Sequence, residues 1–93
     1  MTGKGEIKMY KLKIDKSALR FLEELDDYKY NHLIEEIFNL ENEPRPVGCV
    51  KLNVKSGYRI KWSSYRVLFT IDDVAKTIEI YKIGHRKEIY KKR

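Results

Sequence analysis

Two very short links between three alternating segments constrain the fold of this chain more than any other feature. Residues 58–62, 65–71 and 77–83 each alternate apolar and polar side chains, as half-buried strands do. Only the serine pair at 63–64 separates the first two segments, and a short stretch beginning with the aspartate pair at 72–73 separates the next two. Strands joined by such short links run in opposite directions. The second half of the chain is therefore predicted to form an antiparallel meander of three strands.

The first half of the chain predicts one strand followed by two helices. Residues 9–14 alternate apolar and basic side chains, and apolar residues then recur at helical spacing over 16–25 and over 28–41. We expect Asp15 to cap the first helix and the aspartates at 26–27 to separate it from the second. The predicted fold class is α+β, a small antiparallel sheet made of the N-terminal strand and the meander, with both helices packed on one face.

The length of 93 residues predicts a single domain, with residues 1–8 as a flexible leader and 9–93 as the folded part. No apolar run is long enough for a transmembrane helix or a secretory signal. One cysteine, Cys49, excludes an intrachain disulfide and fits a reducing cytoplasm. Because only His32 and His85 could join Cys49 as soft metal ligands, we expect no metal site.

Charge is segregated along the sequence. The net charge is +6, from 20 basic and 14 acidic side chains. Residues 23–43 carry eight acidic and one basic side chain, whereas 44–66 carry six basic and no acidic ones, and 82–93 carry six basic and one acidic. Concentrated positive charge of this kind favours a polyanionic partner such as nucleic acid.

Strand alternation predicts that several of these cations share one face of the sheet. Arg59 and Lys61 have the same parity in their strand, and Arg66 has the opposite parity to its apolar neighbours, so it should join them. The segment that follows the last strand, with His85 and Arg86, can return near the same patch. Two interpretations stay open at this point: a site for a bound anion, and an ordinary solvated strand face.

Three segments together resemble the RelE/ParE toxin superfamily of type II toxin–antitoxin systems. They are residues 44–48 (PRPVG), 58–69 (YRIKWSSYRVLF) and 83–90 (IGHRKEIY), and the similarity extends over residues 9–91. The superfamily has a strand, two helices and an antiparallel meander, which is the order predicted above. The resemblance therefore implies a RelE-like fold.

The RelE branch of this superfamily consists of mRNA interferases, so the resemblance implies a ribosome-dependent endoribonuclease. In that reaction, the 2′-hydroxyl of one nucleotide attacks the adjacent phosphate in the ribosomal decoding site. The products are a 2′,3′-cyclic phosphate and a 5′-hydroxyl, and neither a metal nor a cofactor is needed. The reaction requires a base, cations that stabilise the charged phosphorane, and an acid for the leaving oxygen.

Six side chains match the family's catalytic positions: Arg59, Lys61, Arg66, His85, Arg86 and Tyr90. Lys61 matches the strand lysine that serves as general base, which nearby cations would help to deprotonate. Arg59 stands where other members have a second lysine and should hold phosphate, and Arg66 should stabilise the transition-state charge. Arg86 is expected to act electrostatically, because a guanidinium is a poor proton donor.

The two remaining matches lie in the C-terminal segment. Tyr90 matches the tyrosine that stacks on or orients a base, and His85 stands near a position where some relatives have an acid or base. We also expect four further basic residues to contact RNA: Arg45, Lys51, Lys87 and Lys91.

The resemblance also implies partners and leaves alternatives. An acidic, RelB-like antitoxin should form a hetero-oligomer with the chain, docking on the helix pair and on the edge strand 9–14. The ribosome and mRNA would be the other partners, and no membrane is expected. Two alternatives share the fold: a ParE-type poison of DNA gyrase, and a catalytically inactive nucleic-acid-binding relative. The complete cation set with Tyr90 favours the nuclease.

Overall fold

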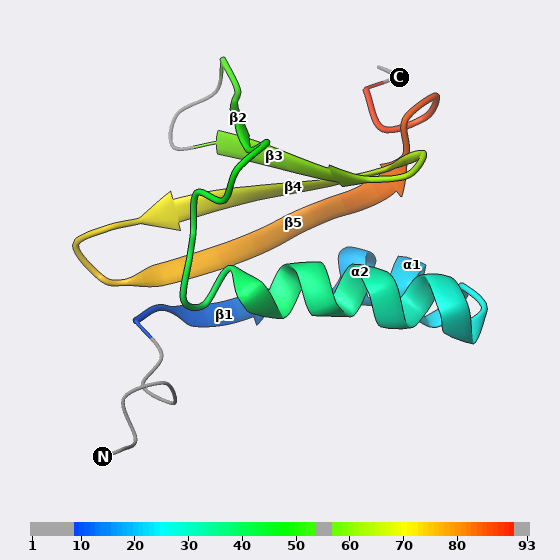
Figure 1. The fold of residues 1–93 in the computed structure, drawn as a ribbon, viewed down its shortest axis with the longest axis horizontal. Coiled ribbons are helices and arrows are strands. Elements are labelled where there is room, and N and C mark those ends of the chain that lie inside the picture. The colour runs from blue at the N-terminus through cyan, green and yellow to red at the C-terminus, as the bar shows by residue number, and fades with distance from the viewer. Residues whose placement is uncertain (1–8, 54–56, 91–93) are drawn as a thin grey trace.

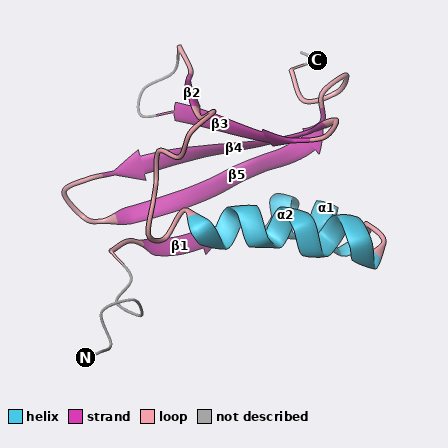
Figure 2. Cartoon of the chain, in the orientation of Figure 1, coloured by secondary structure: helices cyan, strands magenta, loops and turns pink. Residues whose placement is uncertain are grey.

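One mixed sheet and two helices make up the described part of the chain, residues 9–53 and 57–90 of a computed structural model. The elements follow in the order β1 (Lys11–Ile14), α1 (Lys16–Glu23), α2 (Asp27–Asn39), β2 (Val50–Lys51), β3 (Gly57–Trp62), β4 (Tyr65–Asp72) and β5 (Thr77–His85). The strand order is β1-β5-β4-β3-β2, and both helices lie along one side of the sheet (Figures 1 and 2). The α+β class is confirmed. The predicted leader, residues 1–8, lies outside the described residues.

The predicted meander is present. Strand β3 pairs antiparallel with β4, and the pairing of Trp62 with Tyr65 leaves the two serines between them as the turn. Ser63 has a φ of 57°, in the left-handed region where few non-glycine residues are found. Strand β4 pairs antiparallel with β5 from Tyr65 opposite His85 to Asp72 opposite Thr77, so both strands are longer than the alternation predicted.

The N-terminal strand joins the sheet, but the prediction that the whole sheet is antiparallel is wrong. Strand β1 runs parallel to β5, with Leu12 opposite Ile78 and Ile14 opposite Ile80. Alternation specifies which face each side chain occupies but is the same for either strand direction. The direction of β1 therefore depends on the helical crossover that leaves it, which alternation does not report.

The two helices are slightly shorter at their C-terminal ends than predicted, and their N-termini differ from each other. Asp26 caps α2 as expected, because its side chain accepts a hydrogen bond of 2.9 Å from the Lys29 N–H. Asp15 occupies the N-cap position of α1 but makes no capping bond. Its carboxyl group instead lies beside that of Glu79 on β5, and this proximity raises the pKa of Glu79.

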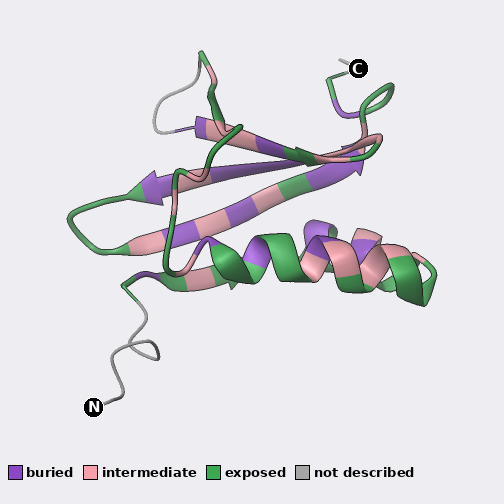
Figure 3. Cartoon of the chain, in the orientation of Figure 1, coloured by how far each residue is buried: buried purple, intermediate pink, exposed green. Residues whose placement is uncertain are grey.

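The core lies between the helices and the face of the sheet that they cover. Its fully buried members come from both layers: Leu22, Leu33, Ile37, Leu40, Val67, Phe69, Ile78 and Ile80. Buried side chains alternate with less buried ones over residues 77–80 of β5, whereas residues 67–69 of β4 are all buried (Figure 3). We call the covered side the helix face and the opposite side, which no helix covers, the open face (Figure 1). None of the described helices is long and apolar enough to cross a membrane.

A polar network fastens the loop between α2 and β2 to the far end of the sheet. Arg45 donates to both carboxylate oxygens of Asp73, at 3.3 and 2.8 Å, and to the Tyr58 hydroxyl at 3.1 Å. The Tyr10 hydroxyl donates to the same Asp73 carboxylate at 2.7 Å. Three segments that are distant in sequence therefore converge on one carboxylate, whose pKa is lowered by these hydrogen bonds.

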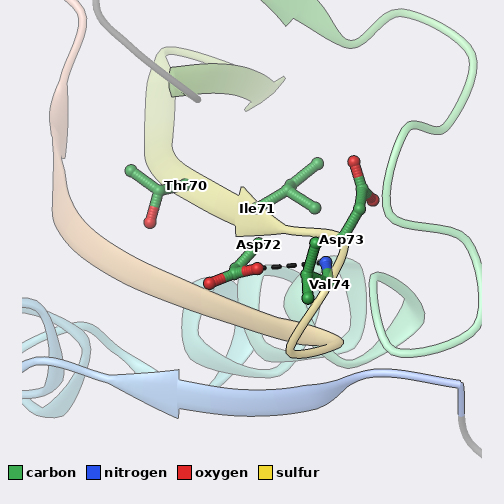
Figure 4. Close-up of a pocket in the computed structure, with 5 residues that line it drawn as sticks. All are labelled: Thr70, Ile71, Asp72, Asp73 and Val74. Atoms are coloured by element: carbon green, nitrogen blue, oxygen red, sulfur yellow. Dashed lines mark hydrogen bonds between the residues drawn. The ribbon is translucent and has the colours of Figure 1, made fainter.

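The β4–β5 turn beside this network encloses a hollow of about 510 Å³ lined by residues 70–74 (Figure 4). The Asp72 carboxylate at its rim accepts hydrogen bonds from the backbone N–H groups of Val74 and Ala75, at 3.0 and 2.9 Å. Because Asp73 is bound by Arg45 and Tyr10, both acidic side chains in this hollow hold the turn together.

We predict that Asp73→Asn lowers the stability of the protein at pH 7 and has a smaller effect near pH 3. The pKa of Asp73 is lower in the folded chain than its unfolded value of about 3.9. Its stabilising effect is therefore present above that value and disappears as the pH falls through the lower, folded pKa. Urea unfolding at the two pH values would measure the difference from the wild-type chain.

Glu43→Gln is the matched control, because it removes the same charge from an exposed carboxylate in the loop that carries Arg45 and leaves Asp73 in place. It should leave the urea midpoint nearly unchanged at both pH values. An Asp73→Asn effect that persists undiminished at low pH would contradict an ionic role for this carboxylate.

Candidate functional site

Three of the sequence-predicted cations lie together on the open face. Lys61 on β3 is directly opposite Arg66 on β4, and Arg59 is opposite Leu68 two positions along. Residues paired directly across neighbouring strands project to the same side of a sheet. The register therefore confirms the predicted grouping of Arg59, Lys61 and Arg66 on the face without helices. None of the three forms a salt bridge with a carboxylate in the part of the chain that the structure describes.

The C-terminal segment, residues 86–90, is fixed at the end of this face. The Arg86 N–H donates to the Ser64 carbonyl oxygen at 2.7 Å, so the segment starts against the β3–β4 turn (Figure 1). The Ile89 N–H then donates to the His85 carbonyl oxygen at 2.9 Å, which turns the chain back. Ile89 is buried, and Gly84, which pairs with Arg66, lies beneath it.

Gly84 is the position that lets this segment approach the sheet. A Cβ atom on Gly84 would lie 3.0 Å from the Ile89 Cδ1 and 3.9 Å from the Ile89 Cα. Contacts this short leave no room for a branched side chain. Leu68 and Ile89 are both buried but belong to no part of the main core cluster. A small second apolar contact layer therefore exists on the open face, beneath the C-terminal segment.

Tyr90 places its hydroxyl beside Arg59. One guanidinium nitrogen of Arg59 (Nη1) donates to the Tyr90 hydroxyl at 3.3 Å. The Arg59 Nε is buried and has no hydrogen-bond partner. An unsatisfied buried donor costs free energy, so the position of this guanidinium carries a local energetic cost. The Tyr90 side chain itself is half-exposed, and it thus joins the predicted cations without being buried.

A β-bulge brings another tyrosine to this face. The pairing of β4 with β5 shifts between Leu68, opposite Lys82, and Phe69, opposite Ile80, which leaves Tyr81 as the extra residue. Burial and the nearby Tyr90 phenol both raise the pKa of Tyr81. Sequence reasoning did not single out Tyr81. The signal was present in the spacing of Ile78, Ile80 and Ile83, where strict alternation breaks after Ile80.

His85 lies on the helix face and not with the cations. It pairs with Tyr65, and the two rings are 5.7 Å apart in an edge-to-face arrangement. Tyr65 in turn stacks on Trp62, whose other side is covered by His32 of α2, at 4.8 Å. The His85 Nδ1 accepts a hydrogen bond of 3.2 Å from the Lys87 N–H. The structure thus does not bring His85 together with Arg59, Lys61 and Arg66.

The other basic residues predicted for the site lie at three places: the β3–β4 turn, the segment after β5, and the surroundings of Tyr58. The Arg66 guanidinium donates to the carbonyl oxygens of Ser63 and Tyr65, at 3.2 and 3.0 Å, and so lies against the β3–β4 turn. Arg86 and Lys87 are exposed directly after β5. Arg45 and Lys51 lie over the Tyr58 ring, 5.0 and 5.2 Å from its centre, far from that turn. Lys91 lies outside the described residues.

The open-face group has the chemistry of an anion site. Guanidinium and ammonium groups donate charge-assisted hydrogen bonds to phosphate oxygens, and Arg59, Lys61 and Arg66 bring three such groups to one face. Among residues 9–53 and 57–90, no three His, Cys, Asp or Glu side chains are placed together to hold a metal ion. Cys49 is half-buried, and burial raises the pKa of its thiol, which disfavours the thiolate.

Comparisons with known proteins agree with this architecture. The family profile described as ParE toxin of type II toxin-antitoxin system, parDE, matches residues 12–90. A chain from the archaeal RelE–RelB complex of Pyrococcus horikoshii OT3 is similar, with a TM-score of 0.78 and 29% identity over 86% of this chain and 98% of that chain. A chain from the RelBE2 toxin–antitoxin complex of Mycobacterium tuberculosis has a TM-score of 0.72 and 25% identity over 86% of this chain and 100% of that chain.

The isolated RelE toxin of E. coli shares the fold. Its TM-score is 0.71, with 24% identity over 82% of this chain and 83% of that chain. The comparison with curated protein sequences found no significant match.

We predict that Gly84→Val lowers the pKa of Tyr81 toward the ordinary tyrosine value of about 10. Valine would displace Ile89, and the C-terminal segment would then carry Tyr90 away from Arg59 and Tyr81. Both causes of the raised Tyr81 pKa, burial and the neighbouring phenol, would weaken. NMR titration of ring-labelled tyrosine would measure the pKa.

Gly84→Ala is the control, because its single methyl group meets only the flexible end of the Ile89 side chain closely. Its effect on the Tyr81 pKa should be distinctly smaller. An unchanged Tyr81 pKa in Gly84→Val would show that the segment does not cover this face as described.

Proposed function

Because the chain belongs to the ParE toxin family of type II toxin–antitoxin systems, we propose that it is a toxin that cleaves mRNA on the ribosome. The proposed reaction is a metal-independent transesterification in which an RNA 2′-hydroxyl attacks its own 3′-phosphate. Solved structures of RelE toxins with up to 29% sequence identity have similar folds. This similarity supports the assignment of a RelE-type nuclease within the superfamily. The proposal places the protein in the cytoplasm, where ribosomes are found.

One observation carries the proposal: Lys61 and Arg66 face each other across β3 and β4 on the open face, with Arg59 and Tyr90 beside them. A phosphodiester bound here would gain charge-assisted hydrogen bonds from two strands of a rigid sheet. Such preorganised cations stabilise the extra negative charge of a phosphorane more than that of the ground state, which is how they would accelerate the reaction.

The proposed roles follow from the chemistry of each group. Lys61, in its neutral form, accepts the proton of the 2′-hydroxyl while the oxygen forms a bond to phosphorus. Arg59 and Arg66 hold the non-bridging phosphate oxygens. The bond from phosphorus to the 5′-oxygen then breaks, leaving a 2′,3′-cyclic phosphate and a 5′-hydroxyl after that oxygen gains a proton.

The C-terminal segment supplies the remaining groups. We assign Arg86 an electrostatic role near the leaving oxygen, since a guanidinium holds its proton too tightly to donate it. Tyr90 would orient a base or a phosphate oxygen next to Arg59. His85, on the helix face, is given a positioning role, because its Nδ1 accepts the Lys87 N–H and fixes the start of the segment.

An acidic antitoxin is the proposed partner. The similar RelE chains from P. horikoshii and M. tuberculosis were crystallised in toxin–antitoxin complexes. The positive charge of this chain favours a partner with acidic segments. Within residues 9–53 and 57–90, no strand lies on the outer side of β1, so this edge offers a place for a partner strand.

A second candidate function is poisoning of DNA gyrase. It is favoured by the family match itself, which covers residues 12–90 and names ParE. A gyrase poison would need the fold but not a catalytic lysine. Variants of Lys61 therefore separate the two functions, because they should abolish RNA cleavage and leave inhibition of supercoiling unaffected.

We predict that Lys61→Ala and Arg66→Ala each reduce mRNA cleavage on programmed ribosomes by roughly 10²- to 10⁴-fold. The reduction follows from loss of the base or of the charge that stabilises the phosphorane. An end-labelled mRNA would be incubated with purified chain, with and without ribosomes, and the product ends would be tested for cyclic phosphate.

Arg20→Ala is the matched control, since Arg20 is an exposed arginine near the end of α1, on the helix side of the sheet. It should cleave like the wild-type chain. Ribosome-independent cutting would preserve the nuclease but remove the decoding-site mechanism. If the wild-type chain does not cleave under any of these conditions and inhibits gyrase, the nuclease proposal fails.

A further inference from the structure

The two-residue turn between β3 and β4 holds a serine where glycine would fit the backbone better. Ser63 has a φ of 57°, whereas Ser64 has no positive φ. A positive φ at only the first central position is a feature of type II′ turns, which normally have glycine there. Glycine adopts a positive φ without the steric cost of a Cβ atom. Serine at position 63 therefore makes the turn less stable than glycine would.

The Ser63 side chain does not compensate for this cost within the structure. Serine is common in turns when its hydroxyl bonds to a nearby backbone group. Ser63 is exposed, and its hydroxyl has no hydrogen-bond partner among residues 9–53 and 57–90. Lys76 is the only other described residue that combines a side chain with a positive φ, and its ammonium group packs 5.1 Å from the centre of the Tyr10 ring. The hydroxyl of Ser63 has no comparable structural use.

The turn that carries Ser63 meets the open-face cations. The Ser63 carbonyl oxygen accepts a hydrogen bond of 3.2 Å from the Arg66 guanidinium. The Ser64 carbonyl oxygen accepts one of 2.7 Å from the Arg86 N–H, so the C-terminal segment starts beside the same turn (Figure 1). Only a few bonds separate the Oγ atom of a serine from its own carbonyl oxygen. The Ser63 hydroxyl and the Arg66 guanidinium can therefore reach a single phosphate group.

We propose that Ser63 contacts the substrate, with its hydroxyl donating a hydrogen bond to a non-bridging oxygen of the scissile phosphate beside Arg66. The inference rests on the proposed function, because it adds a donor to the phosphate that the open-face cations would hold. A hydroxyl donates one directed hydrogen bond without adding charge, so it holds one oxygen while the guanidinium holds another. Backbone strain persists where it serves a function, and here it keeps a donor at a position suited to glycine.

The test uses two substitutions that separate the hydroxyl from the backbone conformation. Ser63→Ala removes the hydroxyl and keeps a Cβ atom at the positive φ, whereas Ser63→Gly removes both. We expect both variants to cleave mRNA on programmed ribosomes roughly tenfold more slowly than the wild-type chain, as loss of a hydrogen bond to a charged group predicts. Only Ser63→Gly should raise the urea midpoint of unfolding. That variant would then be more stable and less active than the wild-type chain.

Lys76→Gly is the control for the backbone effect. Lys76 has a φ of 58° in the turn between β4 and β5, at the opposite end of the sheet (Figure 1). The variant introduces glycine at the same kind of backbone conformation, and it should cleave like the wild-type chain when ribosomes are saturating. A tenfold loss in Lys76→Gly would trace the lower activity to turn flexibility and overturn the proposal.

RNA binding gives a second readout that does not depend on cleavage. A short single-stranded RNA with 2′-O-methyl groups cannot attack its own phosphates, so its affinity can be measured directly. Ser63→Ala should weaken this binding by roughly two- to tenfold. Ser17→Ala, which removes the hydroxyl of an exposed serine on α1, should keep the wild-type affinity.

Each result decides the matter. Cleavage by Ser63→Ala at the wild-type rate would overturn the role of the hydroxyl while the nuclease proposal stands. A loss in Ser63→Ala that Ser63→Gly restores would also overturn it, because both variants lack the hydroxyl. A urea midpoint that Ser63→Gly does not raise would contradict the claim that serine costs stability here. RNA binding that depends on Ser63, in a chain that does not cleave, would support the phosphate contact while the nuclease proposal fails. Absence of both cleavage and RNA binding would overturn both proposals.

Discussion

The packing of two helices on one face of the sheet is the constraint on which the rest of the molecule depends. Val67, Phe69 and Ile71 alternate along β4 toward the helices, and each is buried. Burial of a large apolar side chain is worth about 1.5–3 kcal/mol, so the side of β4 that faces the helices is strongly specified. Because neighbouring positions of a strand project to opposite faces, Arg66 must then lie on the other side. The position of the charged group is a consequence of the core.

The open face is not uniformly polar, and its buried apolar residues hold the C-terminal segment beside the charged residues. Leu68 and Ile89 are buried there, apart from the main core. The bulge at Tyr81 and the absence of a side chain at Gly84 create the space that the C-terminal segment occupies. The segment could not hold the Tyr90 hydroxyl beside Arg59 without this second contact layer.

The sequence pattern predicted the parts of the structure that depend on side-chain alternation. The meander, the helix pair and the grouping of Arg59, Lys61 and Arg66 all follow from which positions must be buried. The direction of β1 does not follow, because alternation is the same in parallel and antiparallel strands. The helix-face position of His85 depends on the bulge at Tyr81, which changes parity along β5. The attachment of Arg45 to Asp73 joins residues 28 positions apart, beyond the reach of any local pattern.

The edge strand β1 bears on how the chain avoids pairing with itself. Lys11 and Lys13 lie opposite Thr77 and Glu79 and so project from the open face. In the part of the chain that the structure describes, no other strand pairs with the outer side of β1. Two copies that joined through this edge would bring four ammonium groups side by side, and like charges across neighbouring strands are destabilising. Lysines on an edge strand discourage sheet-to-sheet aggregation. A strand with carboxylates at the matching positions would neutralise the same lysines. The β1 edge therefore disfavours pairing with a second copy of β1 and favours pairing with a strand from an acidic partner.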